Sequence, residues 1–409
     1  MDAGVAIAAR GDAPAASGGR APAGSAPRRF LAGDPLRGLA ALGVGVYHAG
    51  TVSLFVSGHS GDLVRGWPGP FGPIVGAPIG AGANGVDIFF VLSGYLISRP
   101  FLAAYAAGRK LPRVAAYLRN RFLRIVPAYW VALAAVILVA GPHGRTWSDA
   151  PRLLGFSEDW STSPLRFDFG QAWTLGVEVR YYLAVPILAA VVFGATRLLG
   201  GRPRRPAARL WLIGLIAAAA SVYLFQAFPR DTQQEDFRPI AQAYLLLGGV
   251  VLATAELGGS WRWLASRPGR ALGFAGFAAG VVTLIWMQYP GSPLGLIPGL
   301  DFERSISIVS SIAAVLIVGV PVLLQRGGAG CWRWLDNRAL RWLGARSYGF
   351  YLYQLGVLTE LSYHAPDEGL YHRTFVFLIV VGIPVILVLS ALSWRLVERP
   401  ALRLKASTR

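Results

Sequence analysis

The hydrophobic positions of the chain gather in ten long segments, separated by polar stretches rich in Gly, Pro and Arg. Each segment has about the length that an α-helix needs to cross a bilayer, roughly 20 residues. Backbone polar groups within a bilayer must pair inside the chain, so such spans are helical. We therefore predict an all-α, polytopic membrane protein with about ten transmembrane helices. The segments lie at roughly 36–56, 85–105, 125–141, 173–195, 209–228, 239–256, 271–288, 305–325, 342–360 and 374–396.

The basic residues are distributed unevenly over the polar stretches. With a cytoplasmic N-terminus, ten spans leave 30 basic residues on the cytoplasmic side and 8 on the opposite side, with Arg180 inside a span. Cytoplasmic loops of membrane proteins carry an excess of Lys and Arg. This bias supports ten spans and predicts that both termini are cytoplasmic.

The polar stretches also suggest the domain organisation. Residues 1–29 are rich in Ala, Gly and Pro and lack an apolar core, which predicts a disordered cytoplasmic tail. All apolar segments fall within 30–402, which we predict to form one transmembrane domain, followed by a short cytoplasmic tail at 403–409. The longest outer loops, 57–84 and 142–172, have a composition that suits re-entrant or capping structure.

Composition narrows the function classes. The chain has 409 residues, of which 54% are hydrophobic and 15% charged, and its formal net charge is +18. In a soluble protein this charge would suggest nucleic acid, but arginines in cytoplasmic loops account for it, and we expect no nucleic-acid partner. The single cysteine, Cys331, excludes an internal disulfide and a cysteine metal cluster. The abundance of Arg, Ala and Gly favours a bacterial source.

Arg37 opens the first apolar segment, and His48 lies inside it. They are eleven residues apart, so on a helix they share one face and lie about 16 Å apart along the axis. Arg37 is then at one interface and His48 near the midplane, where an ionisable residue indicates function. Arg37 alone could be a topology anchor, and His48 could be satisfied by a neighbouring helix. A histidine is nevertheless the natural general base.

Two carboxylates lie in other apolar segments. Asp87 is near the outer end of the second, where it could simply stabilise a helix N-terminus. Glu178 is about a turn and a half into the fourth and approaches the predicted depth of His48. An ion pair with Arg180 would be its structural alternative. Ser93 and Gly94, in the second segment, permit close helix approach.

Arg121 and Arg124 lie at the cytoplasmic end of the third segment. Their spacing of three places both on one helix face. Two guanidiniums in this arrangement can hold phosphate groups. Positive-inside charge is an equally good explanation of the pair by itself.

Two further stretches are less informative. Residues 344–354 open the ninth segment with a stripe of tyrosines, which favours packing and interface anchoring. Residues 394–400 end the last segment, and their charges and Pro400 suggest a helix stop with paired charges.

Taken together and in this order, these stretches resemble the acyltransferase-3 family of bacterial integral-membrane acyltransferases over about residues 34–402. Gln354 departs from the pattern, because the family often has a histidine there, and Thr174, Val179 and Arg180 replace more typical Ser, Glu and Gln. The matching parts are the Arg37/His48 spacing, GVDIFFVLSGYLI at 85–97, Arg121/Arg124, WTLGVEVRYY at 173–182 and ERP at 398–400.

The resemblance implies transfer of an acyl group, most often acetyl, from cytoplasmic acyl-CoA to a hydroxyl, with no metal required. His48 is then the catalytic base or the residue that relays the acyl group. Asp87 and Glu178 would orient His48 or the acceptor. Arg37, Arg121 and Arg124 would hold the phosphates of CoA.

The acceptor and one other class of function stay open. A cell-envelope glycan or lipid-linked sugar is the commoner acceptor in the family, and a small natural product such as a macrolide sugar is the alternative. A proton-coupled solute transporter could use His48, Asp87 and Glu178 as a relay. The paired arginines, the motif order and the lack of an evident repeat argue against it. We expect the protein in the bacterial cytoplasmic (inner) membrane.

Overall fold

The computed structural model describes most of the chain from residue 32 onward. The predicted tail at 1–29 and the last four residues lie outside the described part. The described residues are 32–58, 63, 72–140, 150–157, 169–200, 206–227, 242–259, 262–289, 292, 302–326, 335–365 and 371–405.

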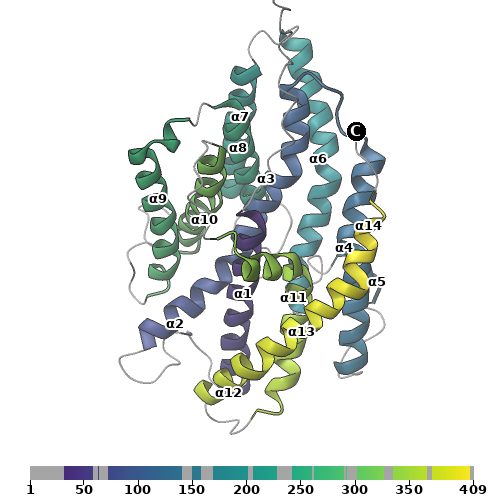
Figure 1. The fold of residues 1–409 in the computed structure, drawn as a ribbon, viewed down its shortest axis with the longest axis vertical. Coiled ribbons are helices and arrows are strands. Elements are labelled where there is room, and N and C mark those ends of the chain that lie inside the picture. The colour runs from purple at the N-terminus through teal and green to yellow at the C-terminus, as the bar shows by residue number, and fades with distance from the viewer. Residues whose placement is uncertain are drawn as a thin grey trace, which may run out of the picture. The chain divides into compact units, whose positions relative to one another are not determined.

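Every regular element among the described residues is helical, which confirms the all-α prediction (Figure 1). The α-helices are α1 Gly33–Val56, α2 Gly72–Ala81, α3 Gly85–Ala106, α4 Val114–Ala140, α5 Ala150–Leu154, α6 Trp173–Gly200, α7 Pro206–Ala227, α8 Ala243–Gly258, α9 Arg267–Trp286, α10 Phe302–Arg326, α11 Arg338–Ser362, α12 Tyr371–Phe377, α13 Ile383–Ser393 and α14 Arg399–Arg403. Short 3-10 turns are η2 Gly82–Asn84, η5 Gly170–Ala172 and η6 Arg262–Ala265, and π turns are η9 Leu378–Gly382 and η10 Trp394–Glu398.

Each of the ten predicted segments coincides with a helix. Seven helical stretches within the described part are long and apolar enough to cross a membrane, and α7 and α8 add two shorter apolar helices. The helix α11 begins with a polar turn and contains several arginines, which lowers its mean hydropathy. The protein is therefore an integral membrane protein, while the count of ten spans and the cytoplasmic termini stay predictions.

Two helix boundaries differ from the hydropathy pattern. Helix α4 begins at Val114, eleven residues before the apolar segment, because the preceding Tyr, Leu and Arg residues are also good helix formers. The predicted stop at 394–400 is wrong, because the helix continues through η10 into α14 and ends at Arg403. A proline removes one backbone donor, and a local π turn such as η10 is one way a membrane helix accommodates it.

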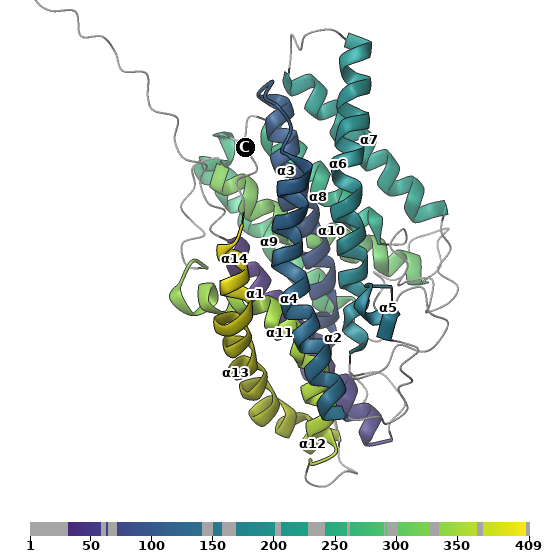
Figure 2. The ribbon, with the colours of Figure 1, turned by 90° about the vertical axis from the view of Figure 1, so that its right-hand side faces the viewer.

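Glycines let two helix pairs meet at backbone distance. The pairs with the most extensive contact are α1 with α11 and α3 with α8, and α3 and α8 lie side by side in Figures 1 and 2. At the α3–α8 crossing, a Cβ on Gly94 would lie 2.0 Å from the Leu246 carbonyl oxygen. At the α1–α11 crossing, a Cβ on Gly344 would lie 1.9 Å from the Asp34 carbonyl oxygen. The close approach predicted for Gly94 is confirmed.

An ion pair with a buried carboxylate, which the sequence analysis did not predict, also joins α3 to α8. The Arg99 guanidinium donates from Nε to Glu256 Oε2 at 2.7 Å and from Nη2 to Glu256 Oε1 at 3.1 Å. The Tyr95 hydroxyl donates to the same carboxylate at 3.2 Å. This pairing depends on which helices meet in three dimensions, so the local sequence around Arg99 does not reveal it.

The α1–α11 crossing should be intolerant of side chains. Gly344→Val would force the helices apart where Arg37 is positioned, and overpacking of this kind costs about 1–3 kcal/mol. We expect the free energy of unfolding in detergent to fall by at least that amount. Gly194→Ala on α6 is the control, because a Cβ there meets nothing within 4 Å. Equal stability of wild type and Gly344→Val would contradict the close crossing.

Candidate functional site

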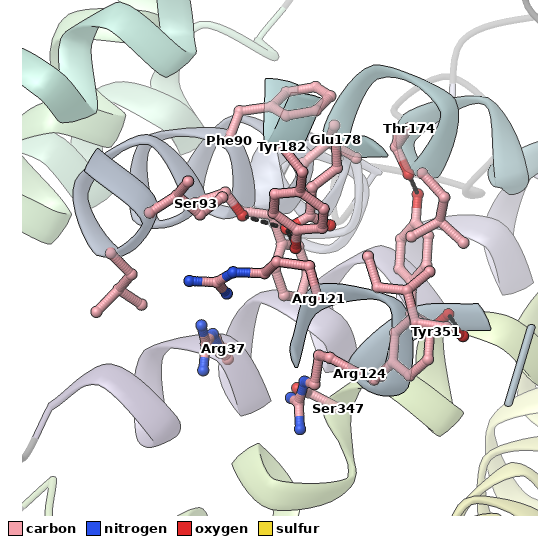
Figure 3. A pocket seen from close by; sticks show the side chains of 17 residues that line it. Arg37, Phe90, Ser93, Arg121, Arg124, Thr174, Glu178, Tyr182, Ser347 and Tyr351 are labelled. Atoms are coloured by element: carbon pink, nitrogen blue, oxygen red, sulfur yellow. Dashed lines mark hydrogen bonds between the residues drawn. The ribbon is translucent and has the colours of Figure 1, made fainter. Parts of the chain in front are cut away.

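A cavity of about 790 Å³, measured with its opening to solvent, lies among α1, α3, α4, α6 and α11 (Figure 3). Its walls combine aromatic and aliphatic side chains with three arginines, one carboxylate and several hydroxyl groups. This mixture is typical of a binding site. The lining residues are Arg37, Val86, Phe89, Phe90, Ser93, Leu96, Ile97, Arg121, Arg124, Ile125, Thr174, Leu175, Glu178, Tyr182, Ser347, Tyr348 and Tyr351.

The three predicted phosphate-binding arginines all line this cavity. Arg37 comes from the first turns of α1, and Arg121 and Arg124 come from one face of α4. In Figure 3 the labelled Arg37, Arg121 and Arg124 side chains converge on the same space. Asp34 Oδ1 lies 3.8 Å from Arg37 Nη1, which is an ion pair too long for a hydrogen bond. The cavity therefore concentrates positive charge in a partly buried setting.

Aromatic rings hold Arg121 in place. Its guanidinium carbon lies 5.4 Å from the centre of the Tyr117 ring and 5.2 Å from that of Tyr182. Cation–π contacts of this kind orient a guanidinium without neutralising it. Tyr117 precedes Arg121 by one helical turn, a spacing visible in the sequence but not used in the prediction. The role of Tyr182 depends on α6 packing against α4 and has no local sequence signal.

Glu178 is the only carboxylate among the lining residues. Its Oε1 accepts hydrogen bonds from Ser93 Oγ at 2.8 Å and from the Tyr182 hydroxyl at 2.5 Å. The alternative of an ion pair with Arg180 is not what the structure shows at this position, because Arg180 Nη2 donates to the Phe156 carbonyl at 3.1 Å. Glu178 therefore lies with the arginines and is held as an acceptor by two hydroxyls.

Hydroxyl groups also fix the wall that α6 and α11 contribute. Thr174 Oγ1 and the Tyr351 hydroxyl lie 2.9 Å apart, and Tyr351 donates to the Gln171 carbonyl at 3.1 Å. Thr174 thus retains a hydroxyl at a position where Ser is more typical of the family that the sequence resembles. On the α4 side, the Tyr348 hydroxyl donates to the Ile125 carbonyl at 2.8 Å. Part of the tyrosine stripe, interpreted as packing, therefore shapes the cavity.

His48 and Asp87 are not among the lining residues. The helix α1 is unbroken from Gly33 to Val56, so Arg37 and His48 do share one helix, and the depth of His48 in the membrane stays a prediction. His48 is partly buried, and its Nδ1 has no hydrogen-bond partner among the described residues. Asp87 lies in the first turn of α3, where its Oδ2 accepts from Asn84 Nδ2 at 3.3 Å.

Two aromatic rings of the cavity wall contact each other. Phe89 and Tyr351 both line it and meet edge to face with centroids 5.8 Å apart. Phe89 also packs against a buried apolar cluster that contains Ala49, and Tyr47 packs against the same cluster. Phe89 therefore contacts both the arginine cavity and the apolar cluster that includes Ala49, a chain neighbour of His48.

Two other motif residues lie deep in the protein. Gln354 is fully buried on α11, and neither amide atom has a hydrogen-bond partner among the described residues. Its Oε1 would lie 3.2 Å from a Cβ on Gly45, one turn before His48. Glu398, expected at a helix end, is 2% exposed and accepts from Ser393 Oγ at 3.4 Å. Neither residue lines the cavity.

The cavity is suited to a polyanion with an apolar arm. Guanidinium groups bind phosphate through paired, charge-assisted hydrogen bonds. The aromatic wall beyond them offers contacts to a less polar segment of the same ligand. No group of three or more His, Cys, Asp or Glu side chains that could hold a metal ion occurs among the described residues.

The fold and the cavity define a helical membrane protein with a cavity lined by three arginines and aromatic side chains. The family described as an acyltransferase domain (acyltransferase-3) matches residues 33–395. This match covers most of the chain, and the chain therefore belongs to the acyltransferase-3 family, as the sequence motifs predicted.

Curated relatives agree with this assignment. The chain is 26% identical over 342 residues to "Putative peptidoglycan O-acetyltransferase YrhL" of Bacillus subtilis, covering 78% of this chain and 50% of that protein. It is 22% identical over 347 residues to "Peptidoglycan O-acetyltransferase OatA" of Listeria monocytogenes, covering 78% of this chain and 51% of that protein. The chain thus spans about half the length of these relatives. No solved structure matches it.

The hydrogen bonds to Glu178 should contribute to stability. Tyr182→Phe removes one donor from a carboxylate inside the protein, and we expect a loss of about 1–2 kcal/mol in the free energy of unfolding in detergent. Tyr181→Phe is the matched control, because the buried hydroxyl of the adjacent Tyr181 has no hydrogen-bond partner among the described residues. If both variants lost the same free energy of unfolding, the Tyr182–Glu178 hydrogen bond would make no specific contribution to stability.

Proposed function

We propose that the protein is a membrane-embedded O-acyltransferase that moves an acyl group, in the first place acetyl, from cytoplasmic acyl-CoA to a hydroxyl of a cell-envelope glycan or lipid-linked sugar. The convergence of Arg37, Arg121 and Arg124 in one cavity is the observation that carries the proposal. The membership of the acyltransferase-3 family and the names of the relatives support the reaction and the glycan acceptor.

The arginines would bind the phosphates of the donor. The pyrophosphate of CoA is negatively charged, and several cationic side chains in one cavity would bind it through charge-assisted hydrogen bonds. Glu178 would hold the position of the cavity wall and limit repulsion among the guanidiniums, because its charge is opposite and it lies in electrostatic range of Arg37. The donor site would face the cytoplasm of a bacterium, at the inner membrane.

The thioester would reach His48 along α1. Arg37 and His48 are about 16 Å apart along the helix axis, which an extended pantetheine arm has to bridge. The arm would pass the ring pair of Phe89 and Tyr351, so these apolar walls would take the uncharged part of the donor. Asp87, near the N-terminus of α3, would orient His48 or the acceptor.

His48 would act as general base. Its ring nitrogen would take the proton from the acceptor hydroxyl while the hydroxyl oxygen attacks the thioester carbonyl carbon. The carbon–sulfur bond then breaks, and the proton passes from the imidazolium to the thiolate to release CoA. The products are an ester and free CoA, and the histidine returns to its starting state.

Binding and chemistry should separate in two variants. Arg124→Ala should weaken acetyl-CoA binding by about 10- to 100-fold, the range for a lost charge-assisted contact. His48→Ala should leave that affinity within about twofold and lower acetyl transfer by at least about 100-fold. Isothermal titration and transfer of labelled acetyl to peptidoglycan fragments measure the two quantities in purified protein.

The control is Arg119→Ala, which removes an exposed arginine of α4 outside the cavity. It should change neither quantity. Unchanged transfer in His48→Ala would overturn the mechanism. Proton-dependent solute uptake into vesicles without acyl-CoA would instead favour a transporter, and transfer to a small sugar but not to envelope glycans would favour a natural-product acceptor.

A further inference from the structure

A fourth cation lies close to the three arginines of the cavity. Lys405 follows α14, and α14 packs on α4, the helix that carries Arg121 and Arg124. In Figures 1 and 2 the helix α14 lies beside α4. The Lys405 backbone N–H donates to the Leu402 carbonyl at 3.4 Å, so the chain forms a hydrogen-bonded turn at this position. The C-terminal end of the described chain thus packs against the helix that supplies two of the cavity arginines.

The electrostatic state of Lys405 reflects this neighbourhood. Partial burial, followed by repulsion from Arg124, Arg121 and Arg37, lowers the pKa of its ammonium group to about 8. Long-range charge alone rarely acts strongly on an exposed lysine in water, because salt screens it. The packing of α14 on α4 and this lowered pKa both indicate that the ammonium group belongs to the same basic cluster as the guanidiniums.

Lys405 occupies the outer position of this cluster. Arg37, Arg121 and Arg124 line the cavity, whereas Lys405 is exposed and does not line it. A donor that enters thioester first places its pantetheine arm deepest and its pyrophosphate next. The 3′-phosphate on the ribose is then the outermost charged group of the donor.

We propose that Lys405 binds the 3′-phosphate of CoA, while the three arginines bind its pyrophosphate. This inference rests on the acyl-CoA donor proposed above. A phosphate monoester and an ammonium group form a charge-assisted contact at the mouth of the site. Lys405 would then select CoA over donors that lack this phosphate, a contribution to specificity that no catalytic motif of the chain supplies.

The chain offers a matched control for this contact. Its sequence contains two lysines, Lys110 and Lys405. Lys110 lies between α3 and α4, is exposed and does not line the cavity. Lys110→Ala therefore removes the same charge from the chain without touching the site.

The test compares the binding of CoA and of dephospho-CoA, which lacks the 3′-phosphate. In Lys405→Ala we expect CoA affinity to fall about 10-fold and dephospho-CoA affinity to stay within about twofold. Lys110→Ala should change neither affinity. Titration calorimetry on purified full-length protein in detergent measures both ligands.

Each other outcome has a defined meaning. An equal loss for both ligands, or no loss for either, would overturn the assignment of Lys405 to the 3′-phosphate and leave the donor proposal standing. If wild-type protein bound neither ligand, the acyl-CoA donor itself would be wrong, and this inference would fail with it.

The pH dependence of the same comparison follows from the pKa of Lys405. The ammonium is charged below about pH 8 and loses its charge above it, whereas the 3′-phosphate stays fully ionised there. The preference of wild type for CoA over dephospho-CoA should therefore fall several-fold as pH rises from 7 to 9.5. Lys405→Arg should keep the preference across this range, because arginine stays charged. A constant preference in wild type would contradict the role of Lys405.

Discussion

The convergence of three guanidinium groups in one cavity is the constraint on which the rest of the site depends. Like charges repel most strongly where protein and lipid exclude water. The protein offsets part of this cost with Glu178, with Asp34 at 3.8 Å from Arg37, and with ring contacts around Arg121. Two carboxylates beside three guanidinium groups still leave a surplus of positive charge, which an anionic ligand would neutralise. The unbalanced charge is thus a property of a binding site rather than of a stable core.

Close helix packing makes this arrangement possible. Arg37 is adjacent to Gly38. A Cβ on Gly38 would lie 2.9 Å from the Gly344 backbone nitrogen, so Arg37 lies where the backbones of α1 and α11 are in near contact. In the same way, Ser93 is adjacent to Gly94, which lies at the close crossing of α3 and α8. In a membrane, where lipid is as apolar as a protein core, such contacts and hydrogen bonds supply much of the association energy. The packing glycines and the cavity residues are therefore neighbours in the chain.

Much of this could be predicted from the sequence, because hydropathy and helical spacing are local properties. Ten apolar segments are helices, and Arg121 and Arg124 share a face as their spacing of three requires. The partners of Glu178 and the Arg99–Glu256 pair could not be predicted, because they depend on which helices meet. Glu398 was misplaced for a related reason, since Pro400 suggested a helix end and a π turn carries the helix past it. The roles of His48 and Asp87 stay predictions.

The most direct test of the account is a cryo-electron microscopy structure of the purified protein with acetyl-CoA in lipid nanodiscs. The account predicts density for the pyrophosphate between Arg37, Arg121 and Arg124, with the pantetheine arm running past Phe89 toward His48. Density for the donor at any other place, with the arginine cavity empty, would contradict it.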